Sequence, residues 1–337
     1  MNWSEGYTAS YYITLVDPIS WRDIGRMEIT GGSIDRSGAE LMESADLDMT
    51  ELPVEREPWV RIWLDADQNG VEHVPLFTGL ASCPERSING ERETYNVECF
   101  SVLKPIDDIL LDRGFYVPAE VTASDAAARL LRKGVAPVEI QPVDNPPKLE
   151  EAIIAEDGES CLTMAERVLN AINWQIIING KGEITVRPKT AEEVAVFDVN
   201  ANDVIELAVS DKYDWFSCPN VFRATSGDLT AIARDDDETS ELSTVNRGRE
   251  IWAEESSVNL GTNESLSAYA MRKLKEMQSP ARTISYSRRY HPDVTVGDIV
   301  RINHPEIGID GSFRVDSQSI DLSFNARTSE TAIMETT

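Results

Sequence analysis

Cysteine and histidine are scarce in this chain of 337 residues, which contains 4 cysteines and 3 histidines. The cysteines are far apart and form no Cys-x-x-Cys pair; they are Cys83, Cys99, Cys161 and Cys218. Zinc sites draw on closely spaced cysteines and histidines, so the sequence predicts no metal site and no bound cofactor. We expect the thiols to be reduced and structural, as small buried groups of a protein made in a reducing compartment.

Catalytic motifs are missing too. The chain has no Gly-x-Ser-x-Gly elbow and no phosphate-binding P-loop. His291 and His304 each precede a proline and indicate turns, because no His-Glu-x-x-His pair accompanies them. A glycosidase needs only two carboxylates, but among 59 acids some pair is always close, so that pattern discriminates nothing. The sequence therefore predicts no catalytic residues.

Long apolar runs and an excess of positive charge are also absent. No run approaches the roughly 18–20 residues of a membrane span, and no signal-peptide pattern is visible at the N-terminus. The 31 Lys and Arg against 59 Asp and Glu give a formal net charge of −28. This balance argues against a surface that grips nucleic-acid phosphates or anionic membranes. The ordinary interpretation is a solvated acidic surface, and the alternative is an acidic wall along which polyanions slide without binding.

What the sequence does contain is alternation of apolar and polar residues, the period of half-buried strands. In the first third it predicts strands at residues 7–16, 45–49 and 95–102, separated by Gly turns. Near the C-terminus, residues 283–323 predict a series of strands with a hairpin turn at Asp310-Gly311. In that series, Phe313 and Val315 are expected on one strand and Ile320 and Leu322 on another.

The middle of the chain differs in composition from Val117-Pro118 onward. It predicts a helix ending at Arg132, a second helix at Cys161–Ile172 with Ser160 as its N-cap, and a hairpin at residues 174–187. A later helix is expected to begin after Asn263, just before the C-terminal strands.

Together these patterns predict a mainly β fold with an α+β insert. We expect two small antiparallel β-barrels per chain, separated by a helix-plus-hairpin domain. The predicted domains are residues 1–116 (first β-barrel), 117–200 (inserted α+β domain) and 201–337 (second β-barrel with a long helix).

Two features suggest surfaces. In the strand after residue 58, Val60, Ile62 and Leu64 face one way and Trp59 and Trp63 the other. A strand that is apolar on both faces is central or covered at an interface, so Trp59 and Trp63 are candidate interface residues. A run of four acids should form a solvated loop; it consists of Asp235, Asp236, Asp237 and Glu238.

Three segments, in order, resemble the baseplate hub or tail hub proteins of tailed phages and the hub part of type VI secretion spike proteins. Leu76–Leu111 resembles the last hairpin of the first hub barrel with its following helix. Asp157–Pro188 resembles the helix and hairpin of the domain between the barrels. Asn263–Ile302 resembles the helix and strands of the second barrel.

The resemblance implies a structural homotrimer whose barrels form a ring. One side would match the sixfold tail tube or a distal tail protein, and the other a threefold spike or tail tip. DNA would pass through the channel without specific binding, and Asp235, Asp236, Asp237 and Glu238 become candidate residues of the channel wall. No spike or peptidase module follows Phe324, so the spike or tip is expected to be a separate polypeptide. The protein would be made in the host cytoplasm and reside in the phage tail or baseplate of the virion.

Two other functions stay open at this point. One is a tail-associated cell-wall hydrolase that uses a carboxylate pair or His291. The other is a carbohydrate-binding module for host recognition that uses tryptophans on strands, among them Trp252. Contractile and long flexible tails are not distinguished by the sequence either.

Overall fold

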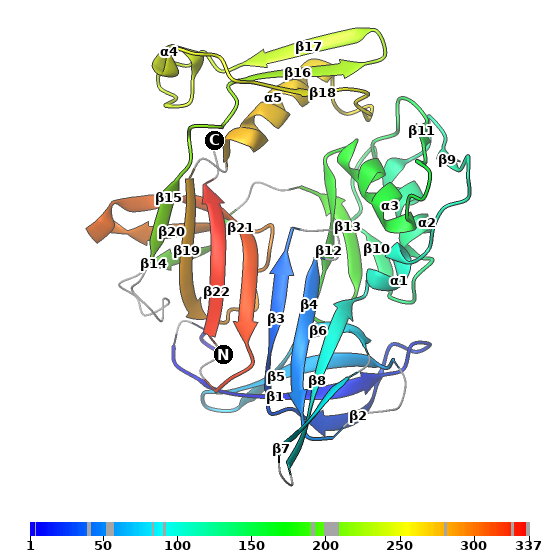
Figure 1. Ribbon diagram of the computed structural model, residues 1–337, viewed down its shortest axis with the longest axis vertical. Helices are drawn as coiled ribbons and strands as arrows, with labels where there is room; N and C mark the ends of the chain where they lie inside the picture. Colours follow the sequence, from blue (N-terminus) through cyan, green and yellow to red (C-terminus); the bar gives the residue numbers. More distant parts are fainter. Residues whose placement is uncertain are drawn as a thin grey trace.

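The computed structural model describes residues 1–3, 5–38, 42–51, 57–82, 84–89, 92–189, 193–198, 209–279, 282–324 and 327–334. Two β units lie side by side, an insert lies against the N-terminal β unit, and a small upper sheet with a long helix lies above the C-terminal β unit (Figure 1). The mainly β fold with an α+β insert is confirmed.

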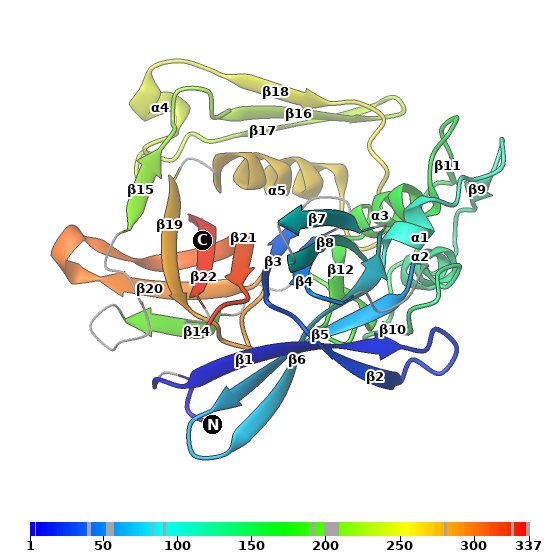
Figure 2. The same cartoon turned by 60° about the horizontal axis from the view of Figure 1, so that its bottom comes forward.

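The N-terminal β unit consists of the strands β1 (Thr8–Val16), β2 (Asp23–Glu28), β3 (Gly31–Ser37), β4 (Glu43–Met49), β5 (Trp59–Asp67), β6 (Val71–Ala81), β7 (Glu85–Asn89) and β8 (Arg92–Ser101). They pair antiparallel in the order β3-β4-β8-β6-β5-β1-β2, with β7 on β8. Strands β1, β2 and β5 cross the bottom of the molecule (Figure 2). The predicted alternation places Ala45, Leu47 and Met49 in the core, where they are at most 1% exposed.

The C-terminal β unit consists of β14 (Glu193–Asp198), β15 (Ser210–Tyr213), β19 (Arg282–Arg289), β20 (Ile299–His304), β21 (Ile309–Asp321) and β22 (Arg327–Met334). Their order is β14-β20-β21-β22-β19-β15, and only the β14–β20 pair is parallel. Ile284, Val300 and Phe313 are fully buried in its core.

Strand β21 joins the two β units. Its first half pairs with β20, and after a register shift between Val315 and Ser317 its second half pairs with β3, from Ser317↔Ser37 to Asp321↔Ser33. Such an irregularity bends a strand and lets it change partners. The result is one sheet of 14 strands, and no closed barrel is found among the described strands. The expectation of two small antiparallel β-barrels is therefore not confirmed; the described strands form two β units that share a sheet.

The insert contains α1 (Lys104–Asp107), β9 (Tyr116–Val117), α2 (Ala123–Leu131), β10 (Val138–Ile140), β11 (Ile153–Ile154), α3 (Cys161–Asn170), β12 (Trp174–Ile178) and β13 (Ile184–Pro188). Ser160 caps α3 as predicted, because its Oγ accepts a hydrogen bond of 3.1 Å from the Thr163 amide. The β12–β13 hairpin is also present as predicted, with β10 added parallel to β13.

The turn between β12 and β13 docks the insert on the N-terminal β unit. Trp21 Nε1 and Arg61 Nη2 both donate to the Lys181 carbonyl, at 2.9 and 3.1 Å. A Cβ at Gly180 would lie 1.9 Å from the Pro75 carbonyl oxygen, so only glycine allows this approach. The turn that the sequence marked as a hairpin is thus also a contact between units.

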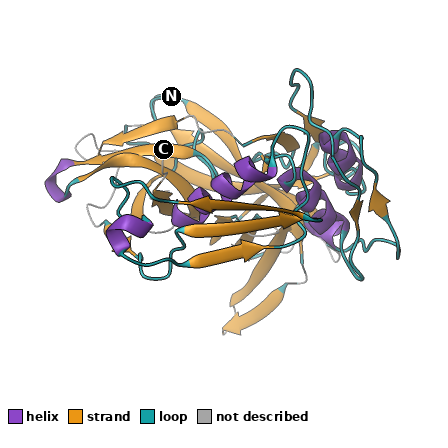
Figure 3. Ribbon diagram, turned by 90° about the horizontal axis from the view of Figure 1, so that it is seen from above, coloured by secondary structure: helices purple, strands orange, loops and turns teal. Residues whose placement is uncertain are grey.

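The upper sheet and its helices are β16 (Val221–Ser226), β17 (Leu229–Arg234), α4 (Thr244–Arg247), β18 (Trp252–Glu255) and α5 (Leu266–Gln278). The sheet order is β17-β16-β18, and α5 packs Tyr269, Ala270 and Leu274 against Phe222 and Ala224. Figure 3 shows this sheet beside α5 from above.

Several local expectations are corrected. Helix α5 is capped by Ser265 instead of Asn263, whose side chain donates to the Ile172 carbonyl. The turn before β21 is a short 3-10 helix, Pro305–Ile307, followed by Gly308 at φ 72°, so Asp310-Gly311 lies inside β21.

The two strands expected around Phe313 and Ile320 are the single strand β21, and β22 follows it without having been predicted. The domain boundaries stay a prediction; β14, which precedes residue 200, pairs with β20. No helix in the described part of the chain is long and apolar enough to span a membrane.

Candidate assembly surfaces

One face of the central strands carries rows of hydroxyls, which range from buried at Ser287 to exposed at Ser329. Cross-strand pairing aligns one row across β19, β22, β21, β3 and β4; its members are Ser287, Ser329, Ser319, Asp35 and Ser44. A second row continues to β15; it consists of Ser210, Ser285, Thr331, Ser317 and Ser37. We call this surface, with the exposed residues of β8, the hydroxyl face.

Five exposed acids lie on the hydroxyl face: Asp35, Asp46, Asp48, Glu98 and Asp321. Three of them accept hydrogen bonds from neutral side chains: Asn96 Nδ2 donates to Asp48, Ser33 Oγ to Asp35 and Ser323 Oγ to Asp321. None of the five forms an ion pair with a described residue. Asp46 lies directly opposite Glu98, so like charges are adjacent on this face.

The opposite face of the same strands carries a buried polar row. It consists of five residues that are paired across neighbouring strands, one from each strand: Tyr286, Glu330, Gln318, Arg36 and Glu43. We call it the buried row. Arg36 Nη1 donates to Gln318 Oε1 at 2.7 Å, and Gln318 Nε2 donates to Glu330 Oε1 at 2.7 Å.

Arg288 neutralises the centre of the buried row. Its Nε lies 2.8 Å from Glu330 Oε2, and the two side chains are 1% and 0% exposed. A buried ion pair of this kind is costly to break, because the remaining charge has no water to solvate it.

At the end of the row, Glu43 is held less well, with Arg36 Nε 3.5 Å from its Oε2 and no described partner for its Oε1. Burial raises the pKa of Glu43 to about 7, and Arg36 opposes the shift.

The two candidate interface tryptophans have different surroundings. Trp59 is 9% exposed and packs against Trp21, with ring centroids 5.3 Å apart, in the core shared with the insert. Trp63 stays partly exposed, stacks on Tyr12 at 6.3 Å, and donates from Nε1 to Thr14 Oγ1 at 3.0 Å. The chain itself covers Trp59, so the argument from two apolar faces holds only for Trp63; an interface role for either stays a prediction.

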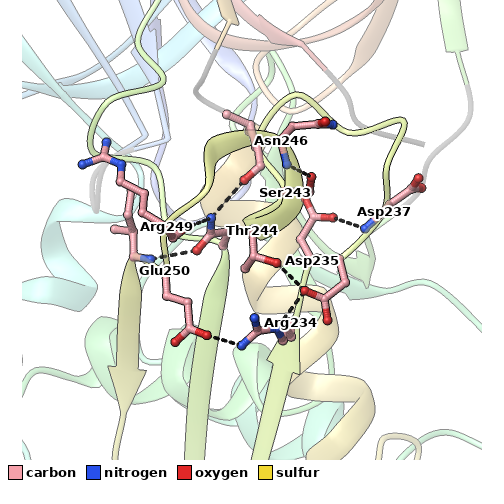
Figure 4. Close-up of polar contacts among 12 residues, drawn as sticks. Arg234, Asp235, Asp237, Ser243, Thr244, Asn246, Arg249 and Glu250 are labelled. Atoms are coloured by element: carbon pink, nitrogen blue, oxygen red, sulfur yellow. Dashed lines mark hydrogen bonds and ion pairs between the residues drawn. The ribbon is translucent and has the colours of Figure 1, made fainter.

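The acid run 235–238 forms a hydrogen-bonded loop after β17 (Figure 4). Asp235 Oδ2 accepts from Ser240 Oγ at 2.7 Å and from Gln278 Nε2 at 3.1 Å. Asp237 Oδ1 accepts from the Thr239 amide at 2.8 Å, which lowers the pKa of Asp237.

Asp236 lies between Arg234 Nε, at 2.7 Å, and Thr244 Oγ1, and the hydrogen bond from Thr244 is the main reason that its pKa is lowered. Glu238 contributes its carbonyl to Asn246, and its carboxylate has no hydrogen bond to a described residue. Three of the four acids therefore shape this loop, and a place for the run on a channel wall stays a prediction.

Among the described residues, no three His, Cys, Asp or Glu side chains are grouped as metal ligands would be. Cys99, Cys161 and Cys218 are buried and unbridged, and burial raises the pKa of Cys99 to about 12. Cys83 lies outside the described residues.

With this architecture, the chain has the fold of phage tail proteins. It matches a tail protein from Neisseria meningitidis MC58 with a TM-score of 0.73 and 14% identity, over 98% of this chain and 97% of that one. It matches the 43 kDa tail protein of prophage MuSo2 from Shewanella oneidensis with a TM-score of 0.68 and 14% identity, over 97% and 98%.

A more distant match is a component of the E. coli type VI secretion system, described as similar to tail proteins of bacteriophage T4. Its TM-score is 0.51 at 7% identity, over 98% of this chain and 74% of that one. The resemblance noted in the sequence is thus confirmed at the level of the fold. No protein-family model and no curated protein sequence matches the chain.

Proposed function

We propose that this protein is a structural tail hub. In this proposal, three copies form a ring that adapts the sixfold tail tube, or a distal tail protein, to a separate threefold spike or tail-tip protein. The observation that carries the proposal is the tail-protein fold over 97–98% of the chain. The hub would act in the phage tail or baseplate of the virion, after synthesis in the host cytoplasm.

The shared sheet supports the proposed symmetry. Each chain contributes two antiparallel β units joined through β21 and β3, so a trimer offers six β units around its axis. Closed cyclic rings of this kind use a heterologous contact, in which one patch of a subunit meets a different patch of its neighbour.

The hydroxyl face is our candidate for the channel wall. It combines small neutral side chains with five acids that have no ion pair among the described residues. Such a surface repels DNA phosphates because its acids outnumber exposed cations such as Arg327, whose Nη2 donates to Ser287 Oγ, so duplex DNA would slide past without specific binding. The acid run 235–238 is a weaker candidate, because three of its carboxylates accept hydrogen bonds within their own loop.

Mass photometry and negative-stain electron microscopy test the assembly. We expect a trimeric ring that becomes more populated as salt is raised, because screening relieves repulsion between subunits of net charge −28. A monomer at all concentrations and salts would contradict the hub.

Trp63→Glu tests the contact separately. Trp63 is partly exposed, and a carboxylate at a buried subunit contact is costly, so the variant should lower the trimer fraction if β5 lies at the contact. Trp252→Glu, at an exposed tryptophan of β18, is the matched control. An unchanged trimer fraction for Trp63→Glu would remove β5 from the interface.

We further propose that the hub has no enzymatic activity. A peptidoglycan zymogram that clears with the wild type and loses clearing with His291→Ala would overturn this.

A further inference from the structure

A cleft of about 1060 Å³ lies between the insert, helix α5 and the C-terminal β unit. All five residues of β12 line one wall of the cleft, and Met271 and Lys275 of α5 line another. Val296 and Arg314 of the C-terminal β unit line a third wall. Arg36, Met42 and Glu43 of the N-terminal β unit line it as well, so its walls come from parts of the molecule that are distant in sequence.

Strand β12 presents a free backbone edge to this cleft. It is the terminal strand of the sheet β10-β13-β12, and in the described part of the chain it pairs only with β13. The Lys189 amide donates to the Asn173 carbonyl, and the Asn179 amide donates to the Glu183 carbonyl. Because hydrogen-bonded pairs alternate along an antiparallel ladder, the N–H and C=O groups of Trp174, Ile176 and Ile178 point away from β13.

The residue opposite Trp174 agrees with this assignment of the groups that point away from β13. Trp174 lies opposite Pro188, which has no N–H to donate. At the beginning of β12, Asn173 Oδ1 is buried, lines the same cleft, and has no hydrogen-bond partner among the described residues. In the described part of the chain, this row of backbone groups and the Asn173 acceptor have no hydrogen-bond partner, in a strand of which Trp174 and Ile176 are each 4% exposed.

The cleft reverses the charge balance of the chain. Its charged lining consists of five cations, Arg36, Lys189, Arg272, Lys275 and Arg314, and three acids, Glu43, Glu166 and Glu276. In the whole chain, by contrast, acids outnumber cations by 59 to 31.

The two lysines that line the cleft, Lys189 and Lys275, form no ion pair with a described residue. Glu276 pairs instead with Arg272 and Lys273, at 2.7 and 3.1 Å. Although Lys189 keeps solvent exposure, its pKa is lowered, first by desolvation in the cleft; Glu276 opposes the shift, and Lys273, Arg272 and Arg314 add to it.

We propose that this cleft receives an extended acidic peptide segment of a partner protein, which adds as a fourth strand to the edge of β12. Backbone hydrogen bonds to Trp174, Ile176 and Ile178 would supply affinity, as in other sheets that accept a peptide strand. Alternate side chains of such a strand point to opposite sides, so carboxylates on one side would face Lys189 and Lys275. Apolar side chains on the other side would meet the apolar lining of the cleft.

The proposal rests on the hub function only in one respect: an assembly component has polypeptide neighbours that could provide the segment. Charge complementarity favours an acidic segment over nucleic acid, because the cationic groups lie inside a cleft whose remaining lining includes Trp174, Ile176 and Met271.

A synthetic peptide tests the proposal directly. The probe is a fluorescein-labelled peptide of about seven residues, in which Glu or Asp alternates with Val, titrated with the full chain by fluorescence anisotropy. Three relatives of the probe serve as comparisons: one with Lys in place of every acid, and two with every second amide N-methylated in opposite phases. We expect binding of the acidic peptide, none of the Lys peptide, and binding of only one of the two methylated peptides.

Charge variants of the protein complete the test. Lys275→Glu and Lys189→Gln should each weaken binding by roughly three- to tenfold, as for partly screened charge pairs at an interface. Lys148→Glu, at an exposed lysine of the insert that does not line the cleft, should leave binding unchanged. Thermal melting confirms that each variant is folded.

Three outcomes would overturn the proposal: equal binding of the acidic and Lys peptides, equal binding of the two methylated peptides, or unaltered binding to Lys275→Glu. A fourth is loss of the trimer in Lys275→Glu without any peptide binding, which would assign the cleft to a second copy of the chain. Sedimentation velocity on the same samples reports the trimer independently, so failure of the peptide proposal and failure of the hub proposal are distinguishable.

Discussion

Polar residues lie on both faces of strands β19, β22, β21, β3 and β4. They are stabilised in opposite ways on the two faces, by water on one and by partners within the protein on the other. On the hydroxyl face, side chains such as Ser319 and Ser329 are small and reach water directly. On the buried row, Gln318 and Glu330 are 1% and 2% exposed and find every partner within the protein. The residues of the two faces alternate along each strand, so a shift of one residue in register would exchange them.

This difference teaches that polarity alone does not mark a solvent face. A buried polar group must be hydrogen-bonded, and a buried charge must also be neutralised, or the desolvation penalty stays uncompensated. Arg36, Gln318 and Glu330 of the buried row meet this condition across the junction of β21 with β3, where the two β units join, whereas Tyr286 Oη and Glu43 Oε1 at its ends have no described partner. We therefore infer that the buried row fixes the register at which the two β units share a sheet.

The largest contrast between the faces should appear with Glu330→Gln. This change leaves the guanidinium of Arg288, which is fully buried, without a countercharge, so we expect a loss of about 3–5 kcal/mol in the free energy of unfolding. Urea unfolding followed by circular dichroism measures it. Ser329→Ala, the adjacent residue on the hydroxyl face, should change the same quantity by less than about 0.5 kcal/mol. Equal losses in the two variants would refute the contrast.

Glu43 sharpens the comparison through pH. Burial raises the pKa of Glu43 to about 7 from its ordinary value of 4.5, so the folded state holds the proton more tightly than the unfolded chain does. Its contribution to stability is complete below about pH 4.5 and is lost as the pH rises through about 7. From pH 5 to pH 8, Glu43→Gln should therefore gain about 2 kcal/mol in the free energy of unfolding relative to wild type.

Urea unfolding at several pH values provides this measurement. Ser44→Ala, the next residue and on the opposite face, is the control and should follow the wild type at every pH. A difference between Glu43→Gln and wild type that does not vary with pH would show that the carboxyl does not titrate in this range.

The sequence predicted the strands themselves well, because half-buried strands have a period of two. The alternation within residues 283–323 predicted β19 in this way, but Arg288 was not recognised as a buried residue of that strand. The sequence of a single strand cannot reveal that Arg288 is buried. The signal is that Arg288, Glu330 and Gln318 all sit at positions of apolar parity in strands that pair, and the pairing is known only from the fold.

Other features depended on distant contacts to a greater degree. The single sheet arises because β21 changes partners at a bulge, and nothing local in residues 309–321 announces that change. The cleft beside β12 requires α5 and Arg314, each more than 85 residues away, to approach a strand edge. By contrast, the cap of α3 and the β12–β13 hairpin were predicted because their determinants are adjacent in sequence.

The smallest effect is expected on the hydroxyl face. Asp46→Lys places a cation opposite Glu98, where the wild type has two like charges side by side. Opposite charges at directly paired positions contribute about 0.2–1 kcal/mol, so the variant should be slightly more stable than the wild type. Removal of a charge from the buried row, by contrast, should cause a large loss of stability. Urea unfolding at low and high salt measures this difference, and salt should reduce it because both groups are exposed. If the hydroxyl face also lines the channel, the assembled variant should bind fluorescein-labelled duplex DNA more strongly at low salt than the wild-type ring does, since each subunit then offers the phosphates a cation. A loss of stability comparable to that of Glu330→Gln would mean that Asp46 is not on a solvated face, and a stable variant ring with no gain in DNA binding would place the channel along another surface.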